Sequence, residues 1–488
     1  MSKIHLSSNS NCIQINLVST APENNSNLKN LKFKADFGQL IFDNNTLYVG
    51  TTFKNSNVSI DPFNKPDYYS LGAKIVSFLK NTELKDLQVN CGFNLKSKEL
   101  EHLILGLLQA SYNFDKYIKE PKSVDYTFYF SDTLSGLISK NQLIYIESVS
   151  QSVDLARDLI NDTPAAINPS TISKIIDEQF GSLNNVSIKT LDYNQMIELG
   201  MEGITAVGKA SVNKPILFHT TIKPKNLATK KIVLIGKGLT YDSGGLDIKT
   251  GGHMAGMKSD MGGSATMFGT TLALAKLGLD NVELHWISAF AENMIDSNAY
   301  KADDILTTYS GQTVEVYNTD AEGRLTLADA LAYATLLDPD YIIDAATLTG
   351  ACIVALSEYN TALMSNDLDL KNKLISKFES ELEPTIYTSM PEILRQYVTG
   401  DISDLNNTST LSRQSGHVTA GLFLSHFVDQ NNFRNLNLQI KTPKVYPWVH
   451  LDIAGSAFNN KHNSLNTKGA TGQSIRSLVS WILDEDKA

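Results

Sequence analysis

The part of the chain after about residue 165 constrains the fold most, because short apolar runs alternate there with helical patterns. The apolar runs predict buried strands at residues 232–235, 282–290, 313–317, 341–344 and 450–453. Helices are predicted within residues 263–277 and at 327–337, the second with Thr326 and Asp329 as a capping box. Strands and helices in alternation indicate an α/β fold with a mostly parallel sheet flanked by helices on both faces. In such sheets, ligands bind beyond the carboxyl ends of the strands.

The 488 residues exceed one ordinary core and predict two domains. A helical pattern at residues 150–160 ends before Pro164 and Pro169, because proline cannot continue a helix. We therefore expect a smaller N-terminal α/β domain over residues 1–150, a linker helix and junction over 151–165, and a larger catalytic domain over 166–488.

The N-terminal region shows short apolar runs and scattered acidic residues rather than a constellation of catalytic groups. Apolar runs occur at residues 39–42 and 46–49, and a helical pattern occupies residues 101–117. The sequence predicts no active site there.

Composition narrows the classes of protein. The net charge of -10 argues against a general nucleic-acid binder, because a phosphate backbone would repel the chain on average. Cys12, Cys91 and Cys352 are widely separated, so we expect reduced thiols rather than disulfides or a Cys-x-x-Cys metal site. The first residues lack an apolar stretch of signal-peptide length, and no run approaches the roughly 18 apolar residues of a membrane span. These observations predict a cytoplasmic protein with no membrane partner.

The first polar stretch after a predicted strand is IGKGLTYDSGGLDIK, residues 235–249. It is not a nucleotide-binding loop, because Tyr241 stands where Gly-x-Gly-x-x-Gly needs glycine and Lys237 is not followed by Ser or Thr. The stretch presents Lys237, Asp242 and Lys249, which are either ordinary charges of a solvated turn or functional groups.

Two further stretches add acidic residues. MKSDMGG at 257–263 presents Asp260 just before a predicted helix, where an aspartate can simply cap the helix. NTDAEGRL at 318–325 places Asp320, Glu322 and Arg324 at alternate positions, which lie on one side of an extended chain. Neighbouring carboxylates repel unless a cation lies between them, so this stretch favours a functional interpretation.

Asp242, Asp260, Asp320 and Glu322 together place four carboxylates on three strand-to-helix loops. Mn²⁺, Mg²⁺ and Zn²⁺ all accept oxygen ligands of this kind. The nine histidines are dispersed and the sequence has no His-Glu-x-x-His motif, so a single zinc held by histidines is not expected. Two ions roughly 3.5–4 Å apart, bridged by carboxylates, would form a hydrolytic site for peptides or for another substrate such as a phosphoester.

These residues resemble the leucyl aminopeptidase (cytosol aminopeptidase) family of metallopeptidases. NTDAEGRL matches that family's motif without change, and GKG-x-T-x-DSGG-x-x-IK and MK-x-DMGG occur in the expected order and spacing. Weaker similarity extends the resemblance to about residues 155–480, through segments at 156–164, 200–211, 344–351, 403–408 and near the C-terminus. The N-terminal region is similar mainly in length and in the segment GLLQASYNFDKY.

The resemblance implies two divalent metal ions per subunit, Mn²⁺ or Zn²⁺, with Mg²⁺ as a further option. Asp242 and Glu322 would bridge both ions, Asp260 and Lys237 would bind one of them, and Asp320 the other. As a ligand, Lys237 must be neutral, so we expect adjacent cations to depress its pKa strongly.

The resemblance also implies two catalytic residues. Lys249 would stay charged and polarise the scissile carbonyl or stabilise its developing oxyanion. Arg324 would hold a bicarbonate-like anion that acts as general base toward the bridging water.

A substrate side-chain pocket is implied at Met257, Thr347, Gly350, Ala454 and Ala457. Such an apolar pocket would favour Leu or Met, although it discriminates by only about 1–3 kcal/mol per methylene. Two positions depart from the family pattern: Thr250 follows Lys249 where proline is common, and Ala457 replaces a larger residue of some relatives.

The family resemblance further implies peptide substrates with a free N-terminus, because the α-amine would bind one ion, and a homohexamer with sites facing an interior cavity. Three alternatives remain. One is a DNA-binding role, as in some bacterial relatives, which the acidic balance opposes. The second is another two-metal hydrolase, and the third is a catalytically silent scaffold, which the intact set of ligands opposes.

Overall fold

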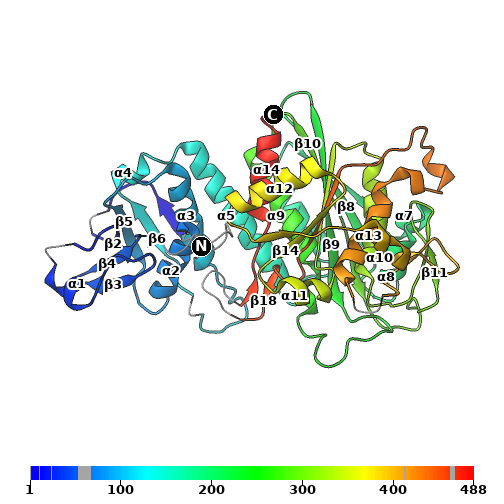
Figure 1. Cartoon of the computed structure of the whole chain (residues 1–488), viewed down its shortest axis with the longest axis horizontal. Coiled ribbons are helices and arrows are strands. Elements are labelled where there is room, and N and C mark those ends of the chain that lie inside the picture. Colours follow the sequence, from blue (N-terminus) through cyan, green and yellow to red (C-terminus); the bar gives the residue numbers. More distant parts are fainter. Residues whose placement is uncertain are drawn as a thin grey trace. The chain divides into compact units, whose positions relative to one another are not determined.

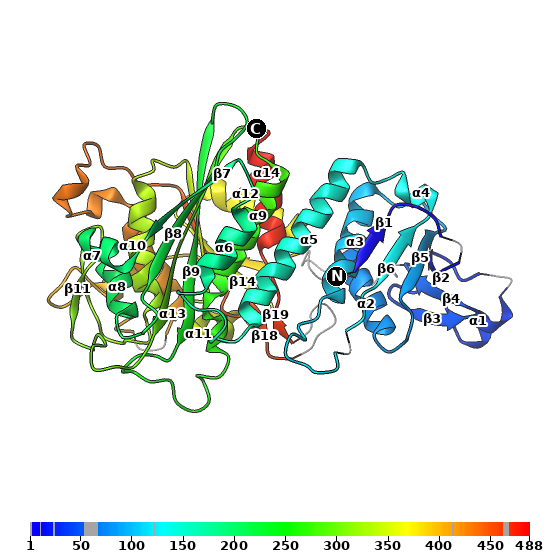
Figure 2. The same ribbon diagram turned by 180° about the vertical axis from the view of Figure 1, so that it is seen from behind.

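The computed structural model describes residues 2–9, 11–22, 25–52, 67–121, 123–411, 414–461 and 468–488. The chain forms two compact units: the N-terminal unit comprises residues 1–154 and 460–468, and the C-terminal unit comprises 155–459 and 469–488. Helix α5 (Lys140–Asn161) crosses the boundary between the units and contains the whole helical segment predicted at residues 150–160. Figures 1 and 2 show the elements of both units from opposite sides.

The N-terminal unit is built on a six-stranded sheet, in which only β3 and β4 pair antiparallel. The strand order is β1 (Lys3–His5), β6 (Thr127–Phe130), β5 (Asp86–Cys91), β2 (Ile13–Val18), β4 (Thr46–Gly50), β3 (Leu40–Asp43). Besides the first part of α5, the helices among the described residues of this unit are α1 (Ser26–Asn30), α2 (Tyr68–Leu79), α3 (Ser97–Ser111) and α4 (Asp132–Ser135). The helix predicted at residues 101–117 is the later part of α3, and it ends at Ser111 because Tyr112 leaves the helix with ψ 140°.

The C-terminal unit contains an eight-stranded sheet whose centre is parallel. Its order is β15 (Thr385–Tyr387), β14 (Thr361–Ser365), β17 (Trp448–Asp452), β13 (Tyr341–Ala346), β9 (Lys230–Asp242), β10 (Val282–Asn293), β8 (Ile216–Ile222), β7 (Val186–Leu191). The four central strands β17, β13, β9 and β10 are parallel to one another, whereas β14 pairs antiparallel with β17, and β8 with β10. The predicted α/β fold with a mostly parallel sheet is confirmed.

Helices cover both faces of this sheet, and alternate residues of β9 face them. On one face, Gly236 brings β9 so close to α9 (Gly262–Leu277) that a Cβ at Gly236 would lie 2.4 Å from the Ser264 Cα. On the other face, Val233 and Ile235 share a buried apolar cluster with residues of α8 (Glu202–Gly208) and α10 (Gly323–Thr335). Beyond α9 lie α14 (Ile475–Glu485) and α12 (Leu368–Ser380), and α13 (Gly416–Ser425) packs on α10 (Figures 1 and 2).

The remaining elements connect these layers. A small sheet joins β11 (Ile305–Thr307), β12 (Thr313–Glu315) and β16 (Leu405–Asn406), and β18 (Phe458–Asn459) pairs with β19 (Gly469–Ala470). The other α-helices are α6 (Ile172–Phe180), α7 (Tyr193–Glu198) and α11 (Gly350–Leu356). The 3-10 helices are η2 (Met257–Met261), η3 (Glu392–Val398), η4 (His426–Val428), η5 (Gln430–Asn432) and η6 (Leu436–Leu438). No helix within the described ranges is long and apolar enough to cross a membrane.

Two local predictions hold only in part. The strand predicted at residues 313–317 is present as β12, but it is shorter and belongs to the small sheet. The helix predicted from residue 327 begins at Gly323, so Thr326 already lies inside it and donates its hydroxyl to the Gly323 carbonyl at 2.9 Å. Asp329 does not cap this helix but accepts the backbone N–H groups of Ile204 at 2.9 Å and Tyr309 at 2.7 Å.

Candidate active site

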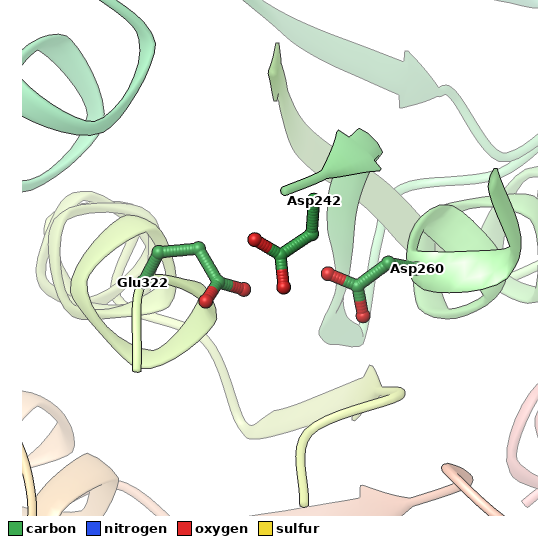
Figure 3. A group of neighbouring side chains, drawn as sticks. All are labelled: Asp242, Asp260 and Glu322. Carbon is green, nitrogen blue, oxygen red and sulfur yellow. The ribbon is translucent and has the colours of Figure 1, made fainter. Parts of the chain in front are cut away.

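Three elements bring carboxylates together at the carboxyl end of β9. Asp242 ends β9, Asp260 lies in η2, and Glu322 immediately precedes α10. One carboxylate oxygen from each residue lies within 4.8 Å of the others, and all three residues are buried. Figure 3 shows the three side chains pointing toward one another. The structure therefore gathers three of the four predicted acidic residues at one point.

Lys237 of β9 lies between two of these carboxylates. Its Nζ is 2.8 Å from Asp260 Oδ1 and 2.9 Å from Glu322 Oε1. It also donates to the Thr347 carbonyl oxygen at 3.1 Å. The side chain is only 4% exposed, so its charge is neutralised by the carboxylates rather than by water.

The loop after β9 returns Lys249 to the same group. Lys249 Nζ lies 2.7 Å from Asp242 Oδ2 and also contacts Asp320 Oδ1. The Lys249 amide donates to the Ser243 carbonyl at 2.9 Å, which closes the loop. Asp320 thereby joins the group through Lys249, and its side chain is 31% exposed, unlike the other three carboxylates.

Two glycines in the motifs are required by close packing. A Cβ at Gly323 would lie 2.4 Å from the Lys237 Cε, so only glycine leaves room for that side chain beside Glu322. A Cβ at Gly263 would lie 2.0 Å from the Ala345 carbonyl oxygen, so glycine lets α9 begin directly against β13. Both positions serve the placement of the charged residues.

The local backbone of Asp320 and Glu322 differs from the extended chain expected from the sequence. Residues 319–320 form a turn, and Glu322 has helical angles, φ -76° and ψ -37°. The two carboxylates consequently do not lie on one side of a strand: Glu322 pairs with Lys237, and Asp320 pairs with Lys249. The prediction of an extended segment was wrong, although the turn still brings both residues into one charged group.

Crowding of like charges shifts the pKa values in the group. Burial raises the pKa of Asp260 well above its ordinary value, and Glu322 and Asp242 add to this against the opposing effect of Lys237. Burial and the charge of Asp242 raise the pKa of Asp320 to about 6 despite Lys249. Burial alone would lower the pKa of Lys237, but the charges of Asp260 and Glu322 raise it above its ordinary value. Without cations Lys237 is therefore protonated, whereas the role of metal ligand requires the opposite shift.

The group fits divalent cations. Four carboxylates face only two lysines, and Asp260 Oδ2 is buried without a hydrogen-bond partner among the described residues. Buried carboxylates that repel one another are stabilised by a positive charge between them, and oxygen ligands suit Mn²⁺, Mg²⁺ and Zn²⁺.

Arg324, in the first turn of α10, is a buried cation. It is 8% exposed, and the part of the chain that the structure describes offers its Nε no hydrogen-bond partner and its guanidinium no ion pair. Burial lowers the pKa of Arg324 to about 10, so the group remains charged at neutral pH. A buried unpaired charge is costly, and an anion bound beside Arg324 would relieve that cost.

Comparison with known proteins identifies the family that carries this arrangement. Residues 154–479 match the family model of the cytosol aminopeptidase family, catalytic domain. The chain belongs to the cytosol aminopeptidase family. The probable cytosol aminopeptidase of Helicobacter hepaticus is 37% identical over 422 residues, which cover 86% of this chain and 85% of that protein. That of Persephonella marina is 39% identical over 394 residues, which cover 79% of this chain and 74% of that protein.

A solved structure extends the comparison to the fold. The bottromycin maturation enzyme BotP in complex with Mn matches with a TM-score of 0.83 and 25% sequence identity, over 97% of this chain and 99% of that chain. As a cytosol aminopeptidase family member, the protein is a metal-dependent exopeptidase. The resemblance inferred from the motifs is confirmed.

The residues that orient Asp242 in this aminopeptidase were not predicted from the sequence. Asn293 ends β10 beside the end of β9, and its Nδ2 donates to Asp242 Oδ1 at 2.8 Å and to the Thr319 carbonyl at 3.0 Å. The Thr319 hydroxyl donates to the Gly244 carbonyl at 2.6 Å, and the Thr319 amide donates to Asp247 Oδ2 at 2.7 Å. A polar residue ending the strand next to β9 was the signal that could have identified Asn293.

The predicted pocket residues of the aminopeptidase follow two strands or begin short helices: Met257 begins η2, Thr347 follows β13, Gly350 begins α11, and Ala454 and Ala457 follow β17. Thr347 donates its hydroxyl to Asp260 Oδ1 at 2.9 Å. A Cβ at Gly262 would lie 3.1 Å from Thr347 Cγ2 and 3.2 Å from Ala457 Cβ, so these two side chains lie together beside the carboxylates. A Cβ at Gly350 would meet nothing within 4 Å.

Proposed function

We propose that this family member is a two-metal leucyl aminopeptidase that removes apolar N-terminal residues, Leu in particular, from peptides. The observation that carries the proposal is the convergence of buried Asp242, Asp260 and Glu322 on one point, with Lys237 and Lys249 ion-paired to them. Charged residues are rarely buried in such a group unless it serves catalysis or metal binding.

The proposed ligand set follows the family motifs residue by residue. Asp242, Glu322, Asp260, Lys237 and Asp320 would together hold the two ions. Two divalent ions, Mn²⁺ or Zn²⁺, supply the hydrolytic chemistry when bound, because they lower the pKa of a shared water and polarise the scissile carbonyl. Asn293 supports this set by holding Asp242 in one orientation through its 2.8 Å hydrogen bond.

Lys237 must change its protonation state to serve as a ligand. The surrounding carboxylates raise its pKa, so the amine loses its proton only when cations replace that proton as the counter-charge. Metal loading is therefore coupled to proton release from this buried side chain.

Lys249 and Arg324 keep their charges and act on the substrate side. The Lys249 ammonium is paired with Asp242 and Asp320, and its flexible side chain belongs to a loop residue. In this position the ammonium can stabilise a developing oxyanion. Arg324 holds a bicarbonate-like anion as general base, which satisfies the buried guanidinium described above.

Specificity rests on two features of the proposed site. A metal centre held by these residues would bind the free α-amine of the substrate, and this would restrict cleavage to the first residue. The side chain of that residue lies against Thr347 and Ala457 in an apolar pocket with Met257, Gly350 and Ala454. The small Ala457 leaves space for Leu or Met.

The proposal also includes the context in which the enzyme works. We propose that it acts in the cytoplasm on peptides with free N-termini, as a homohexamer, and that nucleic acid is not a partner. The net charge of -10 supports the last point.

A substrate panel tests the proposed function. Metal-loaded enzyme is assayed on Leu-Gly, N-acetyl-Leu-Gly, Asp-Gly and a phosphomonoester, by amino-acid or phosphate release. We expect turnover of Leu-Gly, weak turnover of Asp-Gly, and none of the blocked peptide or the phosphoester. If the enzyme hydrolysed the phosphoester but not Leu-Gly, the protein would be another kind of two-metal hydrolase. If it hydrolysed the blocked and the free peptide equally well, it would not be an aminopeptidase.

A further inference from the structure

A fully buried polar network lies on β13 and β17 and has no part in the proposed chemistry. His450 Nδ1 donates to Asp344 Oδ1 at 2.6 Å, and Trp448 Nε1 donates to Asp344 Oδ2 at 2.6 Å. Asp344 and His450 are register partners on adjacent parallel strands, and all three residues have an exposed fraction of 0%. Both oxygens of Asp344 are thus occupied, and the histidine ring is fixed in one orientation.

The other ring nitrogen of His450, Nε2, is buried. Because Nδ1 donates to Asp344, Nε2 is the atom left for a further partner, yet no described residue hydrogen-bonds to it. Burial would lower the pKa of His450, but the charge and hydrogen bond of Asp344 raise it above its ordinary value, which favours Nε2 as a donor. A buried donor without a partner is costly, so a bound acceptor is expected at this position.

Arg324 is the charged neighbour that makes this acceptor an anion. His450 pairs in register with Asp344, and Asp344 with Ile235, which shares its apolar cluster with α10. His450 therefore lies on the face of the sheet that α10 covers, and Arg324 stands in the first turn of α10. Both residues have a buried nitrogen without a described partner, Nε2 and Nε respectively. Asp452 also lies in this region, but its carboxylate accepts the Thr349 hydroxyl at 2.7 Å and the Ala454 amide at 3.1 Å. Since Asp452 satisfies neither donor, two buried donors remain for one small acceptor.

We propose that His450, oriented by Asp344, is a positioning residue that donates Nε2–H to the same small oxyanion that Arg324 holds. The inference rests on the proposed function for the anion and adds two residues to its site. Arg324 supplies the charge, and the rigid Asp344–His450 pair determines where the oxyanion lies relative to the metal centre. A planar carbonate or carboxylate group suits two donors that approach from different elements, α10 and β17.

Two substitutions of His450 by amide residues distinguish the contributions of its two ring nitrogens. In His450→Asn the amide nitrogen takes the place of Nδ1 and keeps the bond to Asp344, but nothing replaces Nε2. In His450→Gln the longer side chain returns a donor near the position of Nε2. The full-length, zinc-loaded proteins are titrated with bicarbonate in CO₂-free buffer at constant pH and ionic strength, with chloride as the control salt.

The readouts are the thermal midpoint, which gives the dissociation constant for bicarbonate, and the bicarbonate dependence of kcat on Leu-Gly. For the wild type we expect the thermal midpoint to rise with bicarbonate and then to saturate. For His450→Asn we expect a dissociation constant about tenfold higher, which corresponds to the loss of one hydrogen bond to a charged group. For His450→Gln we expect a dissociation constant near that of the wild type. Equal dissociation constants in the wild type and His450→Asn would overturn the proposal, even if the variant melted at a lower temperature.

A second measurement keeps the proposal testable if the variants do not fold. In a crystal structure of the zinc-loaded wild type with bicarbonate, we expect the anion within hydrogen-bond distance of both Arg324 and His450 Nε2. An anion bound to Arg324 alone would overturn the role of His450. The protein could also bind bicarbonate in a manner that depends on His450 and yet release no amino acid from peptides. That result would support the anion site and reject the proposed peptidase activity, so failure of the one proposal can be distinguished from failure of the other.

Discussion

The two sheets of this protein have similar architecture but opposite polar chemistry. In the N-terminal unit, amide side chains of β2 and β5 satisfy one another: Asn90 Nδ2 donates to Gln14 Oε1 and to Asn16 Oδ1, each at 2.9 Å. In the C-terminal unit, the end of β9 holds buried carboxylates and lysines whose charges are not fully balanced. The comparison teaches that a parallel sheet with helices provides positions, whereas the residues at the strand ends decide whether a site exists.

Removing one proposed metal-ligating carboxylate should produce the largest effect. We expect Glu322→Gln or Asp320→Ala to lower kcat for Leu-Gly more than about a thousandfold, because the bound ions supply several kcal/mol of transition-state stabilisation. Far-UV circular dichroism and metal analysis should show a folded protein with less bound metal. Asn90→Ala, in the amide ladder of the N-terminal unit, is the matched control and should keep kcat within about twofold. Wild-type turnover in either acidic variant would refute the assignment of these residues as ligands.

Lys249 should affect turnover without affecting metal content. Lys249→Met removes the ammonium proposed to stabilise the oxyanion, and we expect kcat to fall about 10²–10³-fold with little change in KM. Steady-state kinetics and metal analysis on the same sample provide the test. Lys225→Met, whose side chain is 68% exposed and pairs with Asp280, is a control that should behave as the wild type. Loss of metal together with activity would place Lys249 in the structure of the metal site instead.

Metal binding should stabilise the C-terminal unit and leave the N-terminal unit unchanged. An ion at about 100 times its dissociation constant adds about 2.7 kcal/mol to the free energy of unfolding of the unit that binds it. Differential scanning calorimetry with chelator and with Mn²⁺ should therefore move one transition upward and leave the other in place. If both transitions shifted equally, or if neither shifted, the metal site would not belong to the C-terminal unit alone as this contrast between the two sheets requires.

Asp329 allows a smaller test inside the C-terminal unit, away from the charged group. Burial raises the pKa of Asp329 to about 7 in the folded protein, whereas an unfolded aspartate has a pKa of about 3.9. The folded state therefore binds more protons between these values, and this contribution to stability is complete below about pH 4 and is lost as the pH rises toward 7. We expect Asp329→Asn to remove this slope and to cost about 1–3 kcal/mol, because one buried N–H loses its acceptor.

Urea unfolding of both proteins from pH 4.5 to 8 measures that difference. The gap in unfolding free energy between wild type and Asp329→Asn should narrow as the pH rises. A gap that is constant or widens would show that Asp329 is ionised throughout this range in the folded protein.

The central part of the fold could be predicted from the sequence because apolar runs carry the signal. Residues 282–290, 341–344 and 450–453 lie in or overlap β10, β13 and β17 as predicted. Strand β9 is longer than the predicted residues 232–235, because Lys237, Thr240 and Asp242 are buried and interrupt the apolar pattern. The edge strands β7 and β15 and the strand β14 beside β15 were not predicted, since they are short or partly exposed and their apolar pattern is weak.

The candidate site was predictable only where its residues lie within short motifs. The motifs contain Lys237, Asp242, Asp260, Asp320 and Glu322, and the structure brings them together. Their local backbone was not predictable: a turn and a helix start replace the expected extended segment at Asp320 and Glu322. The Asp344–His450 pair was also missed, because its members are 106 positions apart and meet only through strand pairing.

Leucine release from Leu-Gly before chelation, after chelation and after re-addition of Mn²⁺ or Zn²⁺ tests the central claim most directly. The account predicts turnover in the first sample, loss with the chelator, and recovery with either ion, on a protein that remains folded throughout. If the metal-loaded protein released no amino acid from any peptide with a free N-terminus, or if chelation left the rate unchanged, the buried carboxylate group would not be the metal centre of a peptidase.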